Sequence, residues 1–276
     1  MVKDIKKIAL TICAMICCLP ILAQIKVCTT QPQIPVLTKK CYNPVLKVSL
    51  IKETSSNCFV EQITLSLDGY IGDIQSIGLY ASNKEGRLNP YAPLVSPKQA
   101  DKKVTFTNPI VLTKDTTDIW VSIILQPYID LTHKYRITCQ NVEVKGQHVE
   151  MSSIEPLLFL RAGVAMRQGH QDNIHTSRIP GIATSMDNTL LAIFDARYES
   201  SRDLQGNIDI ALNRSNDGGV TWEPTQIVLD MKECGGLPEK FNGVSDACIL
   251  VDENSGTIYV AGLWMHGILD GKSGKW

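Results

Sequence analysis

Short apolar runs follow one another along the chain from residue 45 to about residue 145. They are rich in Val, Ile, Thr and aromatic residues, and they read VLKVSLI, FVEQITLSL, IQSIGLYA, KVTFTNPIVL, TDIWVSIIL and YRITCQNVEV. Turn-forming pairs such as Asp68-Gly69 and Glu85-Gly86 separate them. No sustained apolar spacing at i, i+3, i+4 and i+7 indicates an amphipathic helix. Many short strands at this spacing predict a β-sandwich.

A second series of strand-like runs begins after a connector at residues 151–176. These runs read TLLAIFDA, NIDIALNR, TQIVLDM, ACILVDE and TIYVAGLW, and turns rich in Asp, Asn, Gly and Ser separate them. The pattern therefore predicts two all-β modules, at residues 24–155 and 156–276. The first module shows no cluster of titratable residues, so a structural role for it is as well supported as glycan binding.

The first residues have a different character. MVKDIKK carries positive charge, and the apolar run IALTICAMICCLPILA follows it and ends at Ala23. This layout predicts a signal peptide at residues 1–23, with cleavage after Ala23. A membrane anchor is less favoured because the run is shorter than the ~20 apolar residues of a spanning helix. We expect an exported protein, whether periplasmic, on the cell surface or secreted, with no membrane span after cleavage.

Charge and cysteine content narrow the classes of partner. The net charge is -1 and the pI is near 6.5, which gives no support for nucleic-acid binding. The cysteines beyond the signal are scattered, without a C-x-x-C pair: Cys28, Cys41, Cys58, Cys139, Cys234 and Cys248. A zinc site is therefore disfavoured, while disulfides and buried thiols both stay open. His170, Asp172 and His175 form only a weak metal-like pattern. We expect no metal and no cofactor.

Residues 215–222, SNDGGVTW, predict a tight turn. Ser215 and Asp217 carry short oxygens that accept hydrogen bonds from turn N–H groups. Gly218 and Gly219 permit the positive φ that such a turn needs, and Trp222 begins the next strand. Because every residue has a structural role, a catalytic role for Asp217 is unnecessary.

The same spacing, S-x-D-x-G-x-T-W, is the Asp-box pattern of sialidase propellers. Upstream lie Arg178-Ile179-Pro180, then Asp195-Ala196-Arg197, then Asp203; downstream lies Asp246, which begins a D-x-x-I pattern. Taken together, in this order, the motifs resemble those of exo-α-sialidases, particularly secreted bacterial ones with an N-terminal β-sandwich. The resemblance is strong over residues 160–276 and looser over the sandwich. It implies an all-β chain, with a sandwich followed by the first blades of a six-bladed propeller.

The resemblance also implies roles for individual residues. Arg178 matches the first of three arginines that grip the sialic acid carboxylate, a task that suits a guanidinium. Arg197 resembles a neighbouring arginine that lines the pocket, with an ion pair to Asp195 as the alternative. That pair is less favoured because strand alternation puts both residues on one face. Asp203 matches the general acid/base, in a polar loop where a carboxylate is otherwise merely solvated.

Two further positions match the pocket of the family less closely. Asp246 resembles a carboxylate that contacts the 4-hydroxyl of the sugar, and a strand-edge turn is the alternative. Trp264 would form part of the wall around the N-acetyl group, and a core position is the alternative. The nucleophile of sialidases is a tyrosine, and no position here is assigned to it, to its glutamate partner or to the two other arginines.

A blade needs roughly 40–50 residues, so residues 160–276 provide about two blades and part of a third. We therefore expect an incomplete propeller and no sialoside hydrolysis by this chain alone. The complete protein would release sialic acid from sialylated glycoproteins, glycolipids or oligosaccharides with retention. The alternative is a non-catalytic protein whose sandwich binds glycans and whose propeller is vestigial.

Overall fold

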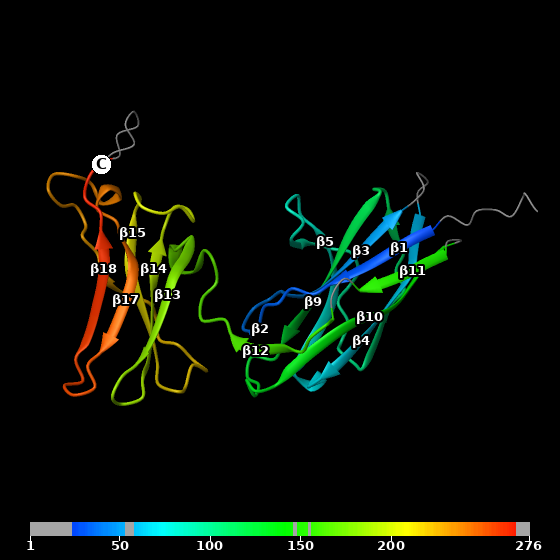
Figure 1. Cartoon of the computed structure of the whole chain (residues 1–276), viewed down its shortest axis with the longest axis horizontal. Coiled ribbons are helices and arrows are strands. Elements are labelled where there is room, and N and C mark those ends of the chain that lie inside the picture. The colour runs from blue at the N-terminus through cyan, green and yellow to red at the C-terminus, as the bar shows by residue number, and fades with distance from the viewer. Residues whose placement is uncertain (1–23, 53–57, 146–147, 154–155, 269–276) are drawn as a thin grey trace, which may run out of the picture. The chain divides into compact units, whose positions relative to one another are not determined.

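The computed structural model describes residues 24–52, 58–145, 148–153 and 156–268 (Figure 1). The predicted signal peptide at residues 1–23 lies outside these residues. The regular structure is almost entirely β, which confirms the predicted fold class, and the described residues contain three short 3-10 helices besides. No helix within the described ranges is long and apolar enough to cross a bilayer. The chain divides into two compact units between Gly163 and Val164, C-terminal to the boundary predicted at 155/156.

The first unit consists of two sheets. One sheet has the order β11(His148–Ser153), β1(Gln24–Thr30), β3(Asn43–Lys52), β9(Thr116–Leu125), β5(Ile74–Ser82), β6(Leu88–Pro93). The other has the order β2(Val36–Thr38), β12(Leu160–Val164), β10(Lys134–Val144), β4(Cys58–Gly69), β7(Lys103–Phe106), and β8(Ile110–Leu112) also pairs with β4. Strand β1 runs parallel to β11 and antiparallel to β3, and β3, β9 and β5 follow one another in antiparallel order. In the other sheet, β4 runs antiparallel to β10, β7 and β8.

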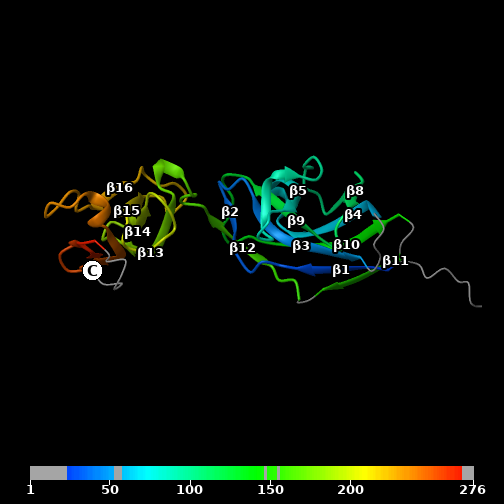
Figure 2. The ribbon, with the colours of Figure 1, turned by 90° about the horizontal axis from the view of Figure 1, so that it is seen from above.

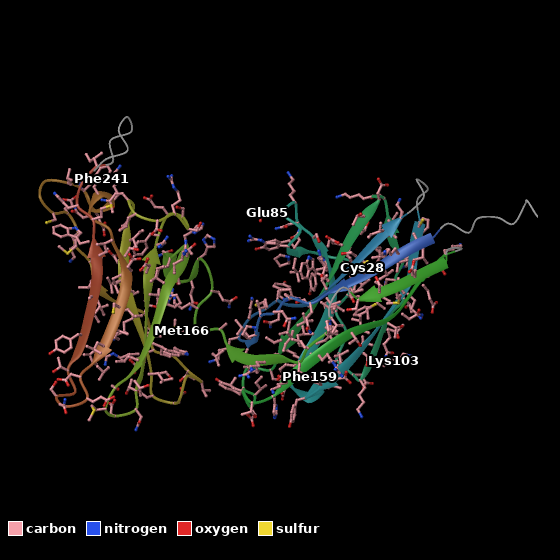
Figure 3. All side chains as sticks on the ribbon, in the orientation of Figure 1. Cys28, Glu85, Lys103, Phe159, Met166 and Phe241 are labelled. Atoms are coloured by element: carbon pink, nitrogen blue, oxygen red, sulfur yellow. The ribbon has the colours of Figure 1, made fainter. Side chains whose placement is uncertain are left out.

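Alternating side chains of the two sheets form one core. Val48 and Leu50 of β3 are buried with Ile119 and Val121 of β9, and they share a cluster with Leu65 of β4 on the other sheet. Figure 3 shows side chains filling the space between these strands. Each large aliphatic side chain buried here contributes about 1.5–3 kcal/mol relative to exposure.

The segment predicted as one strand, KVTFTNPIVL, forms two. It splits into β7 and β8, which pair with different parts of β4. Pro109 has no N–H to donate to a ladder, so the chain leaves the sheet after Phe106 and returns at Ile110. Strand β1 follows directly after the predicted signal and was not among the predicted strands.

The second unit also contains two sheets (Figures 1 and 2). The first is a four-stranded antiparallel meander of β13(Thr176–Thr184), β14(Leu190–Arg197), β15(Ile208–Ser215) and β16(Gln226–Leu229). The second is the hairpin of β17(Val244–Val251) and β18(Ile258–Trp264). A four-stranded meander is the repeating element of a β-propeller.

The two sheets of this unit pack face to face. Leu191 and Ile193 of β14 are buried together with Ile210 of β15 and Val244 of β17. The opposite face of the meander carries Phe194, which is buried in a second small cluster. Both faces of β14 are thus covered, which explains why its sequence, LLAIFDAR, is an apolar run rather than an alternating pattern.

Candidate functional site

Arg197 fixes the position of Asp203 in the loop after β14. Arg197 ends β14 and is only 1% exposed. Its Nη2 donates to Asp203 Oδ1 at 2.9 Å, and its Nη1 donates to the carbonyl oxygens of Ser201 and Arg202 at 3.1 and 2.9 Å. The Asp203 side chain is nevertheless 72% exposed. A buried guanidinium therefore positions a carboxylate that faces solvent.

Arg197 also forms the ion pair with Asp195 that the argument from strand alternation disfavoured. Its Nη2 lies 2.9 Å from Oδ2 of Asp195, and both side chains are buried. The alternation argument was wrong on this pair, because residues i and i+2 on one face of a strand are neighbours and long side chains bridge them. Arg197 is thus bonded to two carboxylates inside the protein. Its predicted role in lining a pocket stays a prediction.

Arg178 lies on β13 next to a bulge. Its neighbour Ile179 has a φ of 52°, and the pairing with β14 skips from Arg178 to Gly181. A β-branched residue in the left-handed region costs about 1–3 kcal/mol, and bulges redirect side chains. Arg178 is exposed and makes no side-chain hydrogen bond or ion pair to any residue that the structure describes. Its guanidinium is therefore available to an external anion.

Asp246 lies at a similar irregularity in the second sheet. Its φ is 59°, and the pairing of β17 with β18 skips from Ser245 to Cys248. Asp246 is exposed, whereas Ser245 beside it is buried. The first strand of each sheet thus carries a bulge with one left-handed, non-glycine residue in it, and each bulge lies at a predicted site position.

The predicted ligand-contacting residues share one end of the two sheets. Arg178 lies near the start of β13, Arg197 at the end of β14, and Asp246 near the start of β17. Trp264 ends β18, where it pairs with Val244, and it is partly exposed beside His266. Because the strands of each sheet are antiparallel and Ser245 of β17 donates to Asp195 near the end of β14, these positions lie at the same end.

The Asp-box turn lies at the other end of β15. Ser215 Oγ donates to Asp217 Oδ1 at 2.8 Å and accepts from the N–H of Gly219 at 2.9 Å. Asp217 also accepts from the N–H and hydroxyl of Thr221, and these bonds lower the pKa of Asp217 to about 2. Trp222 Nε1 donates to the Gly219 carbonyl at 3.1 Å. Asp217 is therefore bonded within its own turn, away from Asp203.

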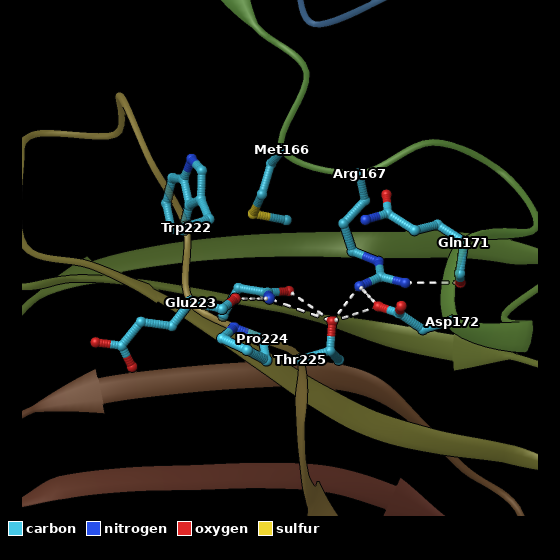
Figure 4. A pocket seen from close by; sticks show the side chains of 9 residues that line it. Met166, Arg167, Gln171, Asp172, Trp222, Glu223, Pro224 and Thr225 are labelled. Atoms are coloured by element: carbon cyan, nitrogen blue, oxygen red, sulfur yellow. Dashed lines mark hydrogen bonds and ion pairs between the residues drawn. The ribbon is translucent and has the colours of Figure 1, made fainter.

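A cavity of about 490 Å³ lies beside this turn (Figure 4). Met166 and Trp222 line it together with Arg167, whose guanidinium bonds Asp172 and the Gln171 carbonyl at 2.8 Å each and also contacts Thr225. Hydrogen bonding to Arg167 lowers the pKa of Asp172. The Asp172 carboxylate of the weak metal-like pattern is thus bonded to an arginine.

Asp195 is the residue of this region that the sequence argument did not select. It is fully buried, and Ser245 Oγ donates to its Oδ2 at 2.6 Å while the Ala247 N–H donates to its Oδ1 at 3.3 Å. The D-x-R spacing on one face of a strand was the available signal. No signal in the sequence marked the contacts of Asp195 to β17, because Ser245 lies fifty residues further along the chain.

Comparisons with known proteins agree with these features. Residues 24–97 match the family described as the N-terminal domain of BNR-repeat neuraminidase. A sialidase of Bacteroides fragilis (strain YCH46) is 31% identical over 92% of this chain and 52% of its own length. A sialidase of Paraclostridium sordellii is 32% identical over 38% of this chain and 23% of its own.

A solved structure, Hadza microbial sialidase Hz136, superposes with a TM-score of 0.74 and 27% identity, over 87% of this chain and 52% of that one. The chain thus spans about half the length of this structure and of the Bacteroides fragilis relative. From these matches and the β-propeller-like second unit, we conclude that the chain is a sialidase-like protein in sequence and in fold.

Proposed function

We propose that this chain supplies part of the active site of an exo-α-sialidase, which removes terminal sialic acid from glycoproteins, glycolipids or oligosaccharides. The observation that carries the proposal is the shared end of the two sheets, where two exposed carboxylates occur together with an arginine that has no side-chain partner among the described residues. The similarity to sialidases supports the substrate class.

Arg178 is suited to the anionic part of the substrate. Sialic acid carries a carboxylate on its anomeric carbon, and a guanidinium binds a carboxylate through two parallel hydrogen bonds. Arg197 differs, because its guanidinium is already bonded to Asp195 and Asp203. Arg178 therefore binds the carboxylate, and Arg197 acts mainly through Asp203.

Asp203 is suited to proton transfer. It is held through Oδ1, and its Oδ2 has no hydrogen-bond partner among the described residues. In a retaining reaction this carboxyl protonates the leaving oxygen and afterwards activates water. Asp246 contacts a hydroxyl of the sugar, and Trp264 provides an apolar wall. The nucleophile of sialidases is a tyrosine, for which we assign no position here.

Substitution of Asp203 tests this proposal in the protein expressed from its complete reading frame. We expect Asp203→Asn to lower kcat for an aryl sialoside by 100-fold or more, since general acid–base catalysis contributes about 10²–10⁴-fold. The measurement is sialic acid release, with the exposed Asp101→Asn as the control. Wild-type activity in Asp203→Asn would contradict the role of Asp203. No release by the unsubstituted complete protein would contradict the function itself.

A further inference from the structure

One buried carboxylate connects the two sheets at the site end. Asp195 accepts hydrogen bonds from Arg197 Nη2 at 2.9 Å, from Ser245 Oγ at 2.6 Å and from the Ala247 N–H at 3.3 Å. The three partners are all donors, and they come from two different sheets. The two oxygens of a carboxylate have acceptor capacity for all three donors.

Each set of bonds leads to a different candidate site residue. Through Arg197, Asp195 reaches the loop that presents Asp203, because the same Nη2 atom contacts both carboxylates. Asp195 also accepts hydrogen bonds from Ser245 and Ala247, which are the residues on either side of Asp246. Asp195 itself has no exposed surface, so it acts on a substrate only through these neighbours.

We propose that Asp195 is a positioning residue, which fixes the Asp203 loop and the Asp246 bulge relative to each other. Its consequence for catalysis rests on the proposed sialidase function, whereas its effect on geometry does not. Replacement by asparagine keeps the shape of the side chain but turns an NH₂ group toward donors. It also removes the buried counter-charge of Arg197. The Asp203 loop and the Asp246 bulge then lose the carboxylate to which both are connected.

Hydrogen exchange on the 276-residue chain tests the geometric part. Asp195→Asn should accelerate amide exchange at least tenfold in residues 198–206 and also in residues 245–248. Asp209→Asn is the matched control, compared at residues 199–206 and 245–248, since Asp209 is a buried aspartate on the neighbouring strand β15 that among the described residues bonds only Tyr198, outside these two ranges, and none of the predicted site residues. Acceleration in one segment only, in neither, or equally in the control would overturn the proposal.

Ser245→Ala keeps the test informative if Asp195→Asn does not fold. It removes one bond on the β17 side and leaves the Arg197 pair intact. Exchange should then accelerate at residues 245–248 while residues 198–206 stay as in the unsubstituted chain. Acceleration of both segments, or of neither, contradicts the separate connections that we assign to Asp195.

Kinetics of the complete protein test the catalytic part. Because misplacement of a reacting group by about 1 Å costs about 100-fold in rate, we expect Asp195→Asn to lower kcat by about that factor. Ser245→Ala should mainly raise KM, because it loosens only the sugar-binding side. Asp209→Asn should keep both constants within about twofold. If Asp195→Asn changes hydrogen exchange as expected but the unsubstituted complete protein releases no sialic acid, the proposed function is refuted. The positioning role of Asp195 is then still supported.

Discussion

Two buried aspartates on neighbouring strands are stabilised differently. Asp195 has three donors around it, whereas Asp209 accepts one hydrogen bond from the described residues, from Tyr198 Oη at 2.9 Å. Asp230 and Glu239 also lie near Asp209. Burial, reinforced by these acids, raises the pKa of Asp209 to about 6. A folded protein that prefers the protonated acid loses stability as the pH rises.

Asp209→Asn should therefore stabilise the protein at neutral pH. The unfolded carboxyl ionises near pH 4 and the folded one near pH 6, so stability falls between these values and is constant above them. The variant removes this loss, which we estimate at up to about 3 kcal/mol. Thermal melts should show a higher Tm than wild type at pH 7.5 and little difference at pH 4. Equal Tm values at both pH values would contradict the burial argument.

At the scale of the element, the Asp-box turn depends on an ionised Asp217. Its bonds to Thr221 lower the pKa to about 2, so this stabilisation is present above the unfolded pKa near 4 and is lost as the pH falls toward 2. We expect Asp217→Asn to lower the Tm at pH 7, with the difference from wild type shrinking below pH 4. The exposed Glu253→Gln should show no such window. A pH-independent difference would mean that shape, not charge, matters in this turn.

The elements were predictable to different degrees. Strands with clear turn residues around them, such as β3 and β9, were found within a few residues. Strand β13 was not predicted, because Pro180 and Gly181 interrupt its run of apolar residues. The motif around Arg178 nevertheless indicated that this segment carries a site residue. The bulges at Ile179 and Asp246 had no local signal, because they depend on the pairing of strands rather than on the residues themselves.

At the scale of the whole molecule, the series of strand-like runs predicted two all-β modules, and the order of motifs indicated the similarity to sialidases. It did not predict the role of Asp195. Its partners Ser245 and Ala247 are brought to it by the packing of β17 against β14, and packing between separate sheets leaves no spacing in the sequence. The number of blades stays a prediction.

The outer face of β17 and β18 is apolar and exposed. Leu250, Tyr259 and Leu263 are each more than half exposed, and they lie on one face of the hairpin. Exposed apolar patches of this kind favour association, so we expect the 276-residue chain to self-associate in solution. Leu250→Ser combined with Tyr259→Ser should reduce the weight-average mass in analytical ultracentrifugation. Tyr91→Ser, at an exposed position in the first unit, should not. A monomeric unsubstituted chain would contradict this expectation.

The most direct test of the central claim is a crystal structure of the complete protein with an unsaturated sialic acid analogue. We predict the analogue at the shared end of the two sheets, with its carboxylate about 3 Å from the guanidinium of Arg178. Asp203 should lie within hydrogen-bonding reach of the anomeric centre. Binding to the sandwich alone, or at the Asp-box end of the meander, would contradict the account.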